Sequence, residues 1–240
     1  MYTIWNHSLS YRRRTNKLTL IDTCFLRDVS SLEAYVRDVG YGMSEINRIV
    51  LTHVHIDHIQ AANEIKKVSG GHAKIYSHWA EAGYLANNPQ YHGPLTHEAL
   101  AQILQKYKIR SEDLVKKFGS FEREKIIVDH ILKDGDMIGK KLRVVHTPGH
   151  TPGHISLYLE KERIIFGADS LFKSVMDVEG LCILPSEVSI DPATAAVSAD
   201  RLSRLKCDKL FLAHQDSPVL ERAQDAIQQA ARVAVRNLKS

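Results

Sequence analysis

The feature that most constrains this chain is a cluster of ligand-type side chains in residues 53–58. Three imidazoles and one carboxylate fall within these positions, namely His53, His55, Asp57 and His58. Neutral imidazole and carboxylate are the ligands that zinc and related metals accept in proteins. With 13 histidines in the chain, the pattern would arise by chance about twice in a thousand such sequences. A capping role at a strand end suits one histidine but not three, so the cluster predicts a metal site.

The hydrophobic pattern indicates where this cluster lies. Residues 48–52 predict a strand that runs directly into His53, and residues 59–68 predict a helix that ends at Gly70. Further strands are expected at 18–21, 73–76, 126–128, 142–146, 155–159, 164–167 and 209–213, and helices at 30–39, 191–205 and 221–238. Asp169 and His214 also follow predicted strands directly, and His150 follows one after a short turn. Ligands from these strand ends can converge on one point, although a lone Asp or His there would indicate only a cap.

A second motif, residues 147–154, contains two Pro-Gly pairs on either side of His150. Such pairs predict tight turns that aim a side chain away from a packed strand, and a rigid loop suits a metal ligand. His154 leads into the next predicted strand, so a structural hydrogen bond is the favoured interpretation of that residue. Most of the remaining histidines are assigned ordinary surface or capping roles.

Together these motifs resemble the metallo-β-lactamase superfamily, and residues 147–154 are most similar to glyoxalase II and related thioesterases. The resemblance covers nearly the whole chain and implies an α/β (α+β) fold, the αββα four-layer sandwich. It also implies the ligand sets: a first metal held by His53, His55 and His150, a second held by Asp57, His58 and His214, and Asp169 bridging the two. By the same resemblance, Asp22 would orient a ligating histidine.

Three features depart from the family pattern. Cys24 stands where the family usually has glycine, close to the expected site. The stretch between His58 and His150 is longer than in a minimal glyoxalase II. Phe172 occupies the place where lactone-cleaving relatives carry a catalytic tyrosine, which counts against a close match to the lactonases.

Composition is that of an ordinary globular protein, and we expect one domain over residues 1–240. Hydrophobic residues make up 44% and charged residues 25%, and the formal net charge is only +4. The basic residues are scattered apart from residues 12–14, so no nucleic-acid partner is expected. The cysteines form no close pair, which favours a reducing cytoplasm. No apolar run approaches the ~18 residues of a membrane span, so no membrane association is expected.

Residues 77–125 change to helical periodicity and are expected to form a helical insertion. Helices with one apolar face must bury it, so the insertion is expected to cover the pocket or to form a homodimer contact. Tyr84, Tyr91 and His92 within it, and Lys173 beyond Asp169, are the candidate contacts to a small-molecule substrate.

The sequence therefore predicts a metal-dependent hydrolase with two divalent ions, zinc first, with iron or manganese as alternatives. A hydroxide shared by the two ions would attack an ester-like carbonyl, in a thioester, lactone or simple ester, and Asp57 would pass a proton to the leaving group. One rival is a persulfide dioxygenase with a single iron. Another is a phosphodiesterase or nuclease of the same superfamily, and a non-catalytic metal-binding role would leave a complete ligand set unused.

Overall fold

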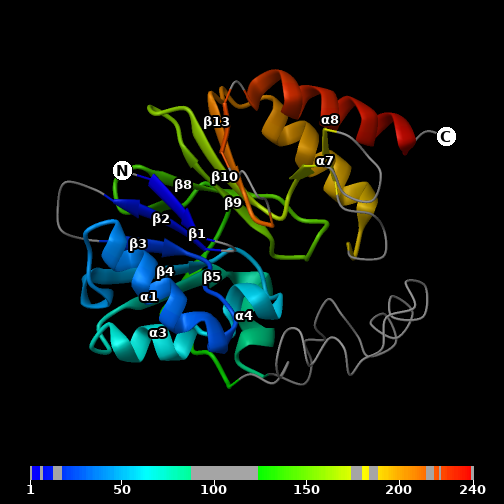
Figure 1. The fold of residues 1–240 in the computed structure, drawn as a ribbon. Coiled ribbons are helices and arrows are strands. Elements are labelled where there is room, and N and C mark those ends of the chain that lie inside the picture. Colours follow the sequence, from blue (N-terminus) through cyan, green and yellow to red (C-terminus); the bar gives the residue numbers. More distant parts are fainter. Residues whose placement is uncertain are drawn as a thin grey trace, which may run out of the picture. The chain divides into compact units, whose positions relative to one another are not determined.

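A computed structural model of the chain describes residues 2–5, 8–12, 18–87, 124–173, 180–183, 189–214, 219–221 and 223–238. The chain divides into two compact units, Met1–Ser77 with Glu81–Ile131, and His78–Ala80 with Leu132–Ser240. Each unit is built on one six-stranded sheet (Figure 1). The expectation of a single domain over residues 1–240 stays a prediction.

The sheet of the first unit has the order β1 (Tyr2–Trp5), β2 (Ser8–Arg12), β3 (Leu18–Ile21), β4 (Ile46–Leu51), β5 (Lys74–His78) and β6 (His130–Leu132). β3, β4 and β5 run parallel, whereas β1 and β2 are antiparallel to their neighbours. All four residues of β3 are buried, as expected for a parallel strand covered on both faces. The predicted strands at 18–21, 48–52 and 73–76 are thus confirmed.

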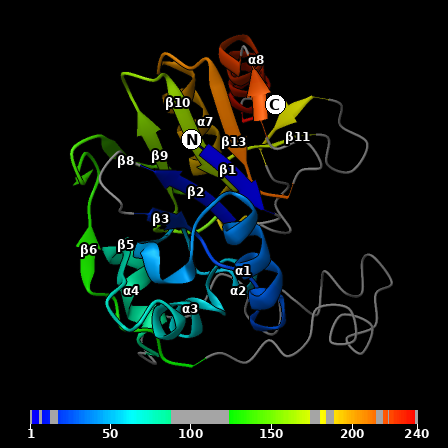
Figure 2. The same cartoon turned by 60° about the vertical axis from the view of Figure 1, so that its left-hand side comes forward.

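Helices α1 (Val29–Asp38) and α3 (Ala62–Val68) pack on this sheet (Figure 2). Leu32 of α1 and Ile65 of α3 join Leu20 and Ile49 of the sheet in one buried apolar cluster. Short helices η1 (Leu26–Asp28), η2 (Met43–Glu45), α2 (Ile56–Ile59) and α4 (Trp79–Leu85) complete the described helices of the first half of the chain.

The helix expected at 59–68 is confirmed over Ala62–Val68, but it starts later than expected, because the chain turns at residues 60–61 between α2 and α3. The Ala61 amide donates to the Cys24 carbonyl at 3.0 Å instead of to its own helix, and a new helical turn starts when Ile65 donates to Ala61. The strand expected at 126–128, by contrast, is wrong. Ile126 donates instead to the carbonyl of Leu85, and β6 begins at His130.

The sheet of the second unit has the order β14 (Val219–Glu221), β13 (Lys209–Leu212), β10 (Ile164–Ala168), β9 (Ile155–Leu159), β8 (Leu142–His146) and β7 (Met137–Ile138). β7 to β10 form an antiparallel meander, and β13 pairs with β10 in parallel. A separate hairpin pairs β11 (Phe172–Lys173) with β12 (Leu181–Cys182).

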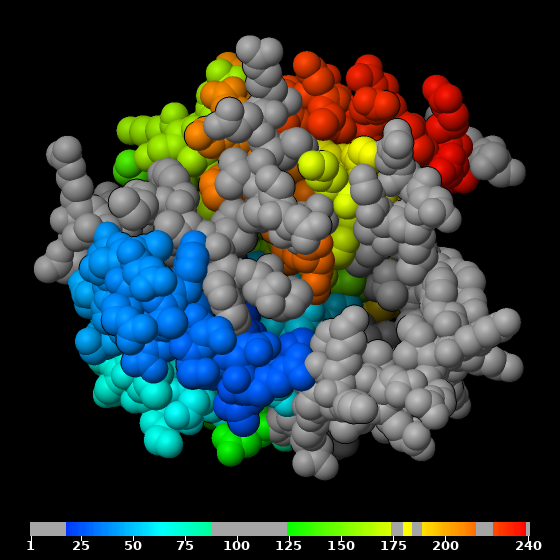
Figure 3. Space-filling model, in the orientation of Figure 1, coloured from blue at the N-terminus to red at the C-terminus, as the bar shows by residue number. Residues whose placement is uncertain are grey.

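Helices α7 (Pro192–Ser203) and α8 (Ala223–Asn237) pack on the second sheet. Leu202 of α7 and Ile227 of α8 share a buried cluster with Ile165 and Leu210 of the strands. Asp191 caps α7 by accepting from the Thr194 amide, as the Asp191-Pro192 pair predicts. The opposite face of α8 is exposed, and the helix lies at the surface of its unit (Figure 3).

Only the start of the expected helical insertion is described: α4 is helical, and residues 88–123 lie outside the described residues. Tyr91 and His92 fall in that part, so their proposed substrate contacts, the pocket cover and the homodimer contact stay predictions. Within the described residues, no helix is both long and apolar enough to cross a membrane.

Candidate metal centre

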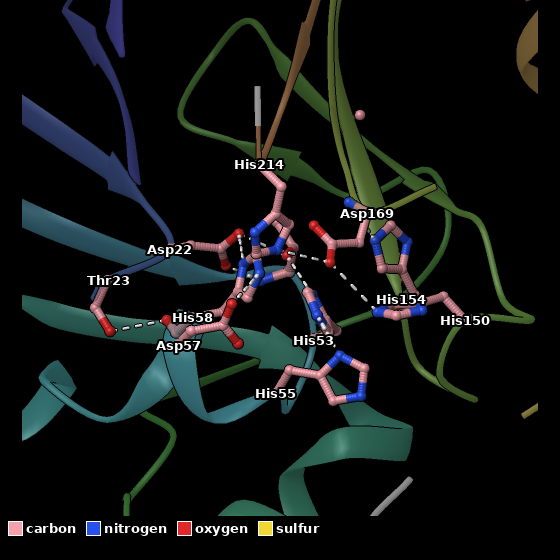
Figure 4. Close-up of polar contacts among 12 residues, drawn as sticks. Asp22, Thr23, His53, His55, Asp57, His58, His150, His154, Asp169 and His214 are labelled. Atoms are coloured by element: carbon pink, nitrogen blue, oxygen red, sulfur yellow. Dashed lines mark hydrogen bonds and ion pairs between the residues drawn. The ribbon is translucent and has the colours of Figure 1, made fainter. Parts of the chain in front are cut away.

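The first histidine motif starts at the carboxyl end of β4 and continues into α2. His53 and His58 are completely buried, whereas His55 and Asp57 are partly exposed. His55 is the residue that precedes the first turn of α2, and Asp57 and His58 lie in that turn. The four predicted ligands of this unit therefore leave the backbone within one strand end and one helical turn (Figure 4).

Asp22 fixes both ends of this motif. It follows β3, which is parallel to β4, so its side chain reaches the same edge of the sheet. Its Oδ1 accepts from the Thr52 amide and its Oδ2 from the Thr52 hydroxyl, each at 2.7 Å, and Oδ2 also lies 2.9 Å from His58 Nδ1. Burial raises the pKa of the Asp22 carboxyl, and the neighbouring His58 and the hydrogen bonds from Thr52 offset part of that effect. Asp22 and Thr52 thus form a rigid base for the motif.

The contact with Asp22 selects one nitrogen of His58 for a metal. Because Nδ1 donates to a carboxylate, the lone pair of the neutral ring is at Nε2, which lies 3.6 Å from Asp57 Oδ2. The main chain of His58 is held as well, since its carbonyl accepts from both the amide and the hydroxyl of Thr23. His58 is therefore fixed in both position and tautomer.

His53 and His55 bring two imidazole nitrogens close together. His53 Nε2 lies 3.0 Å from His55 Nδ1, and His53 Nδ1 lies 3.0 Å from the Thr52 hydroxyl. Two nitrogens bound to one tetrahedral zinc ion are about 3.3 Å apart. The 3.0 Å spacing of the His53 and His55 nitrogens therefore fits two imidazole ligands of one divalent cation.

The second unit brings together Asp169, His150 and His214. Asp169 follows β10 and His214 comes two residues after β13, and the parallel pairing of these strands brings both residues to one sheet edge. Asp169 Oδ2 lies 3.5 Å from His150 Nε2 and 3.2 Å from His214 Nε2 (Figure 4). One carboxylate oxygen thus faces two imidazole nitrogens, an arrangement that suits a bridging ligand. Asp169 and His150 are buried, and the His214 side chain is 28% exposed.

Backbone conformation is unusual at three of these positions. Asp22, Ala168 and His214 have φ angles of 58°, 45° and 55°. Non-glycine residues rarely adopt this left-handed region, and such strain is often found at functional sites. Each of the three residues lies at or beside a strand end. Asp22 supports a predicted ligand, Ala168 directly precedes one, and His214 is one.

The loop that carries His150 is held against the start of α7. Asp191 donates its amide to the Gly149 carbonyl at 2.9 Å, and the Ser198 hydroxyl donates to the Pro148 carbonyl at 2.6 Å. Gly149 has a φ of +128°, and a Cβ atom there would lie 2.2 Å from the Ala195 amide nitrogen. Only glycine allows this close approach.

Tyr84, Lys173 and Cys24, the other described residues that the sequence singles out, lie in different environments. Tyr84 packs against the apolar cluster of the first unit, and Lys173 is exposed on β11. Cys24 is completely buried, and burial, with a contribution from Asp28, raises the pKa of its thiol to about 12. It is a packing residue in the interior of the first unit. Substrate contacts by Tyr84 and Lys173 stay predictions.

Sequence reasoning missed several residues that support the ligands. The sequence places Thr52 only in a strand, and it does not predict the stacking of Phe172 on His214, with ring centroids 5.6 Å apart. The structural hydrogen bond expected of His154 is confirmed, because its Nε2 accepts from the Asp169 amide. The sequence signal for Thr52 is a hydroxyl residue at the end of an apolar run, directly before a predicted ligand.

Comparison with known proteins supplies the family. The sequence profile of the metallo-β-lactamase superfamily matches residues 6–214. The chain is 28% identical over 183 residues to the probable metallo-hydrolase YflN of Bacillus subtilis (strain 168), covering 71% of this chain and 64% of the relative. It is 28% identical over 125 residues to the hydroxyacylglutathione hydrolase GloC of Haemophilus influenzae, covering 52% and 50%. The matched part of the chain thus spans less than two-thirds of these relatives.

Solved structures agree with this assignment. The metallo-β-lactamase family protein TTHA1429 from Thermus thermophilus aligns with a TM-score of 0.67 and 22% identity, covering 97% of this chain and 74% of that one. TTHA1623 in a di-iron-bound form aligns with a TM-score of 0.59 and 20% identity, covering 94% and 96%. These likenesses confirm the predicted fold class. The chain belongs to the metallo-β-lactamase superfamily, whose members include metal-dependent hydrolases.

Proposed function

We propose that this protein is a binuclear metallohydrolase that cleaves an ester-like carbonyl compound, which is a thioester, a lactone or a simple ester. The observation that carries the proposal is the carboxylate oxygen of Asp169, which faces the Nε2 atoms of both His150 and His214. The family pattern assigns these two histidines to different metals, so a ligand that faces both is what a bridged pair of ions requires. A single ion held by two histidines and one carboxylate could use the same arrangement, but it would leave Asp57 and His58 without a metal.

The proposed ligand sets follow from the family pattern and the chemistry of each unit. One ion would be held by His53, His55 and His150, the other by Asp57, His58 and His214, with Asp169 between them. Support for the first set comes from the 3.0 Å spacing of the His53 and His55 nitrogens. Support for the second comes from Asp22, which directs the lone pair of His58 to Nε2.

When bound, two divalent ions supply a water molecule activated at neutral pH and polarise the substrate carbonyl. The chain's own residues then have three tasks. Buried His53, His58 and Asp169 keep their geometry because each is held by neighbouring polar groups. Asp57, whose side chain is 18% exposed, carries a proton to the leaving group. Phe172, at the place where lactone-cleaving relatives carry a tyrosine, has no hydroxyl to donate.

Relatives favour thioesters within this substrate class. GloC is a hydroxyacylglutathione hydrolase, and the human relative MBLAC2, 28% identical over 126 residues, is an acyl-coenzyme A thioesterase. That alignment covers 51% of this chain and 40% of MBLAC2. Zinc is the expected metal, with iron or manganese as alternatives, because imidazole and carboxylate ligands accept all three. An acidic group on the thioester would meet Lys173.

Metal analysis combined with a substrate panel tests the proposal. Protein purified without added metal is expected to carry about two ions per chain. Zinc-loaded protein is then assayed against an acylglutathione, an acyl-coenzyme A, a lactone and a phosphodiester, and iron-loaded protein is tested for oxygen uptake with glutathione persulfide. Thioester turnover at two ions per chain supports the proposal. Oxygen uptake with one iron, or phosphodiester turnover faster than that of every carbonyl substrate, would overturn it.

A further inference from the structure

A chain of buried polar groups lies behind Asp169 in the second unit. His154 is completely buried, its Nε2 accepts from the Asp169 backbone amide at 3.2 Å, and its Nδ1 lies 2.9 Å from the Thr147 hydroxyl. His154 comes from the loop before β9, whereas Asp169 follows β10. The ring therefore links the motif that carries His150 to the strand end that carries Asp169 (Figure 4).

The donor and acceptor roles in this chain of groups follow from the first contact. A backbone N–H can only donate, so His154 Nε2 is the acceptor and the ring proton is on Nδ1. Nδ1 then donates to the Thr147 hydroxyl, whose own proton points to Ser156 Oγ at 3.0 Å. Ser156 in turn lies 3.5 Å from the Gly167 carbonyl and 3.4 Å from the Ser170 hydroxyl, the residues on either side of the turn at Asp169.

The backbone that His154 holds is strained. Ala168, directly before Asp169, has a φ of 45°, in the left-handed region that costs a non-glycine residue free energy. Such a conformation persists only where neighbouring contacts hold it. The backbone amide of Asp169 lies in this turn, and it donates a hydrogen bond to the His154 side chain.

We propose that His154 is a positioning residue for the Asp169 carboxylate, acting through its Nδ1–H tautomer and the Thr147 hydroxyl. The inference rests on the proposed function, because the direction of the Asp169 carboxylate affects metal binding only if Asp169 is a metal ligand. The alternative is that His154 only fills and stabilises the interior. The two roles differ in which substitutions at position 154 are tolerated.

Side-chain geometry separates these roles. Glutamine places its amide oxygen near the position of the imidazole Nε2 and can accept from the Asp169 amide, whereas asparagine reaches only the position of Nδ1. Leucine fills the space with no polar atom. We expect His154→Gln, which keeps the acceptor for the Asp169 amide but loses the donor to Thr147, to lower metal affinity about 3- to 10-fold. His154→Asn and His154→Leu, which lose the acceptor as well, are expected to lower it about 10- to 100-fold.

Two readouts test this. Metal affinity is measured by competition with a chelator, and the hydrogen-exchange rate of the Asp169 amide is measured by NMR in metal-free protein. His154→Leu is expected to raise that exchange rate at least about tenfold, because the amide loses its acceptor. The exchange measurement does not depend on the proposed function, so the hydrogen bond is tested even if the protein proves not to be a hydrolase.

Matched variants complete the experiment. Ile155→Val, at the neighbouring buried position of β9, weakens packing without touching the hydrogen bonds and should leave metal affinity unchanged. Thr147→Val removes the acceptor of Nδ1 while keeping the shape, and should lower metal affinity even if His154→Leu fails to fold. If wild-type protein binds metal but the Gln, Asn and Thr147 variants all bind it equally well, His154 has only a structural role. If wild-type protein binds no metal, the proposed function fails instead.

Discussion

Asp22 Oδ2 lies 2.9 Å from His58 Nδ1, and both side chains are completely or almost completely buried. The two residues are separated by 36 positions in the sequence. They meet because β3 and β4 are parallel neighbours, so the segments that leave their carboxyl ends share one edge of the sheet. The same carboxylate holds Thr52 through two hydrogen bonds, so one residue sets the orientation of the motif that begins at His53.

Asp22→Asn is therefore expected to lower metal affinity about 10- to 100-fold. An amide has one oxygen and one NH₂ group, so it cannot accept from both the Thr52 amide and His58 Nδ1. If the NH₂ group faces His58, the ring proton moves to Nε2, the nitrogen proposed to bind metal. Chelator competition gives the affinity, and Asp38→Asn on the exposed side of α1 is the matched control. Equal affinity in the two variants would show that Asp22 does not set the His58 tautomer.

Gly149→Ala is expected to lower the free energy of unfolding by about 3 kcal/mol or more. The new Cβ would overlap the Ala195 backbone, and the φ of +128° would be strained as well. Gly135→Ala is the control, because Gly135 also has a positive φ, +83°, but has open space around it. That variant should lose only about 1 to 2 kcal/mol. Urea denaturation measures both, and equal losses would mean that the loop moves away from α7.

Much of the fold could be predicted from sequence because its strands are short and strongly apolar. Parallel strands buried on both faces, such as 18–21 and 164–168, leave a clear hydrophobic run. Residues 59–68 show the limit of this reasoning, since helical periodicity continues through the point where Ala61 donates to Cys24. A contact between residues 37 positions apart overrides the local pattern, and a single sequence does not report it.

The predicted ligands were identifiable because chemistry restricts which side chains bind metals, whereas their supports were not. Thr52 is an ordinary strand residue by composition, and only the fold brings it to Asp22, 30 positions away in the sequence. The stacking of Phe172 on His214 depends likewise on the parallel pairing of β10 with β13. Hydrogen-bond partners that are far apart in the sequence need the sheet register before they can be named.

Asp129→Asn is expected to destabilise the protein at neutral pH and to lose that effect in acid. Burial would raise the pKa of Asp129, but hydrogen bonds from the Ile75 amide and Lys66, with the charge of Lys74, lower it overall below 3.8. A carboxyl whose pKa is lower in the folded state stabilises the fold above its unfolded pKa. That stabilisation is lost as the pH falls through the folded value. Because the Asp129 side chain is 19% exposed and its partner Lys74 is 53% exposed, solvent screening limits the effect to about 0.5 to 1 kcal/mol.

Denaturation at pH 7 and near pH 3 checks this expectation, with Asp38→Asn as the control. The difference between wild type and Asp129→Asn should be present at pH 7 and shrink toward zero at the lower pH. A difference that stays constant with pH would mean that the carboxylate charge contributes nothing, and that shape or the Ile75 hydrogen bond accounts for the whole effect.

Removing metal is expected to destabilise wild-type protein, and Asp169→Asn is expected to abolish most of that difference. An ion that binds only the folded state adds about 2.7 kcal/mol to the free energy of unfolding when its free concentration is 100 times Kd. Asp169 faces both His150 and His214, so neutralising it should weaken binding of each ion, while its similar shape preserves the packing of the turn. The experiment compares chelator-treated and zinc-buffered samples by thermal unfolding. His72→Gln, at an exposed position, is the control and should retain the full zinc-dependent gain. If Asp169→Asn gains as much stability from zinc as wild type does, its carboxylate is not a metal ligand and the bridging assignment is wrong.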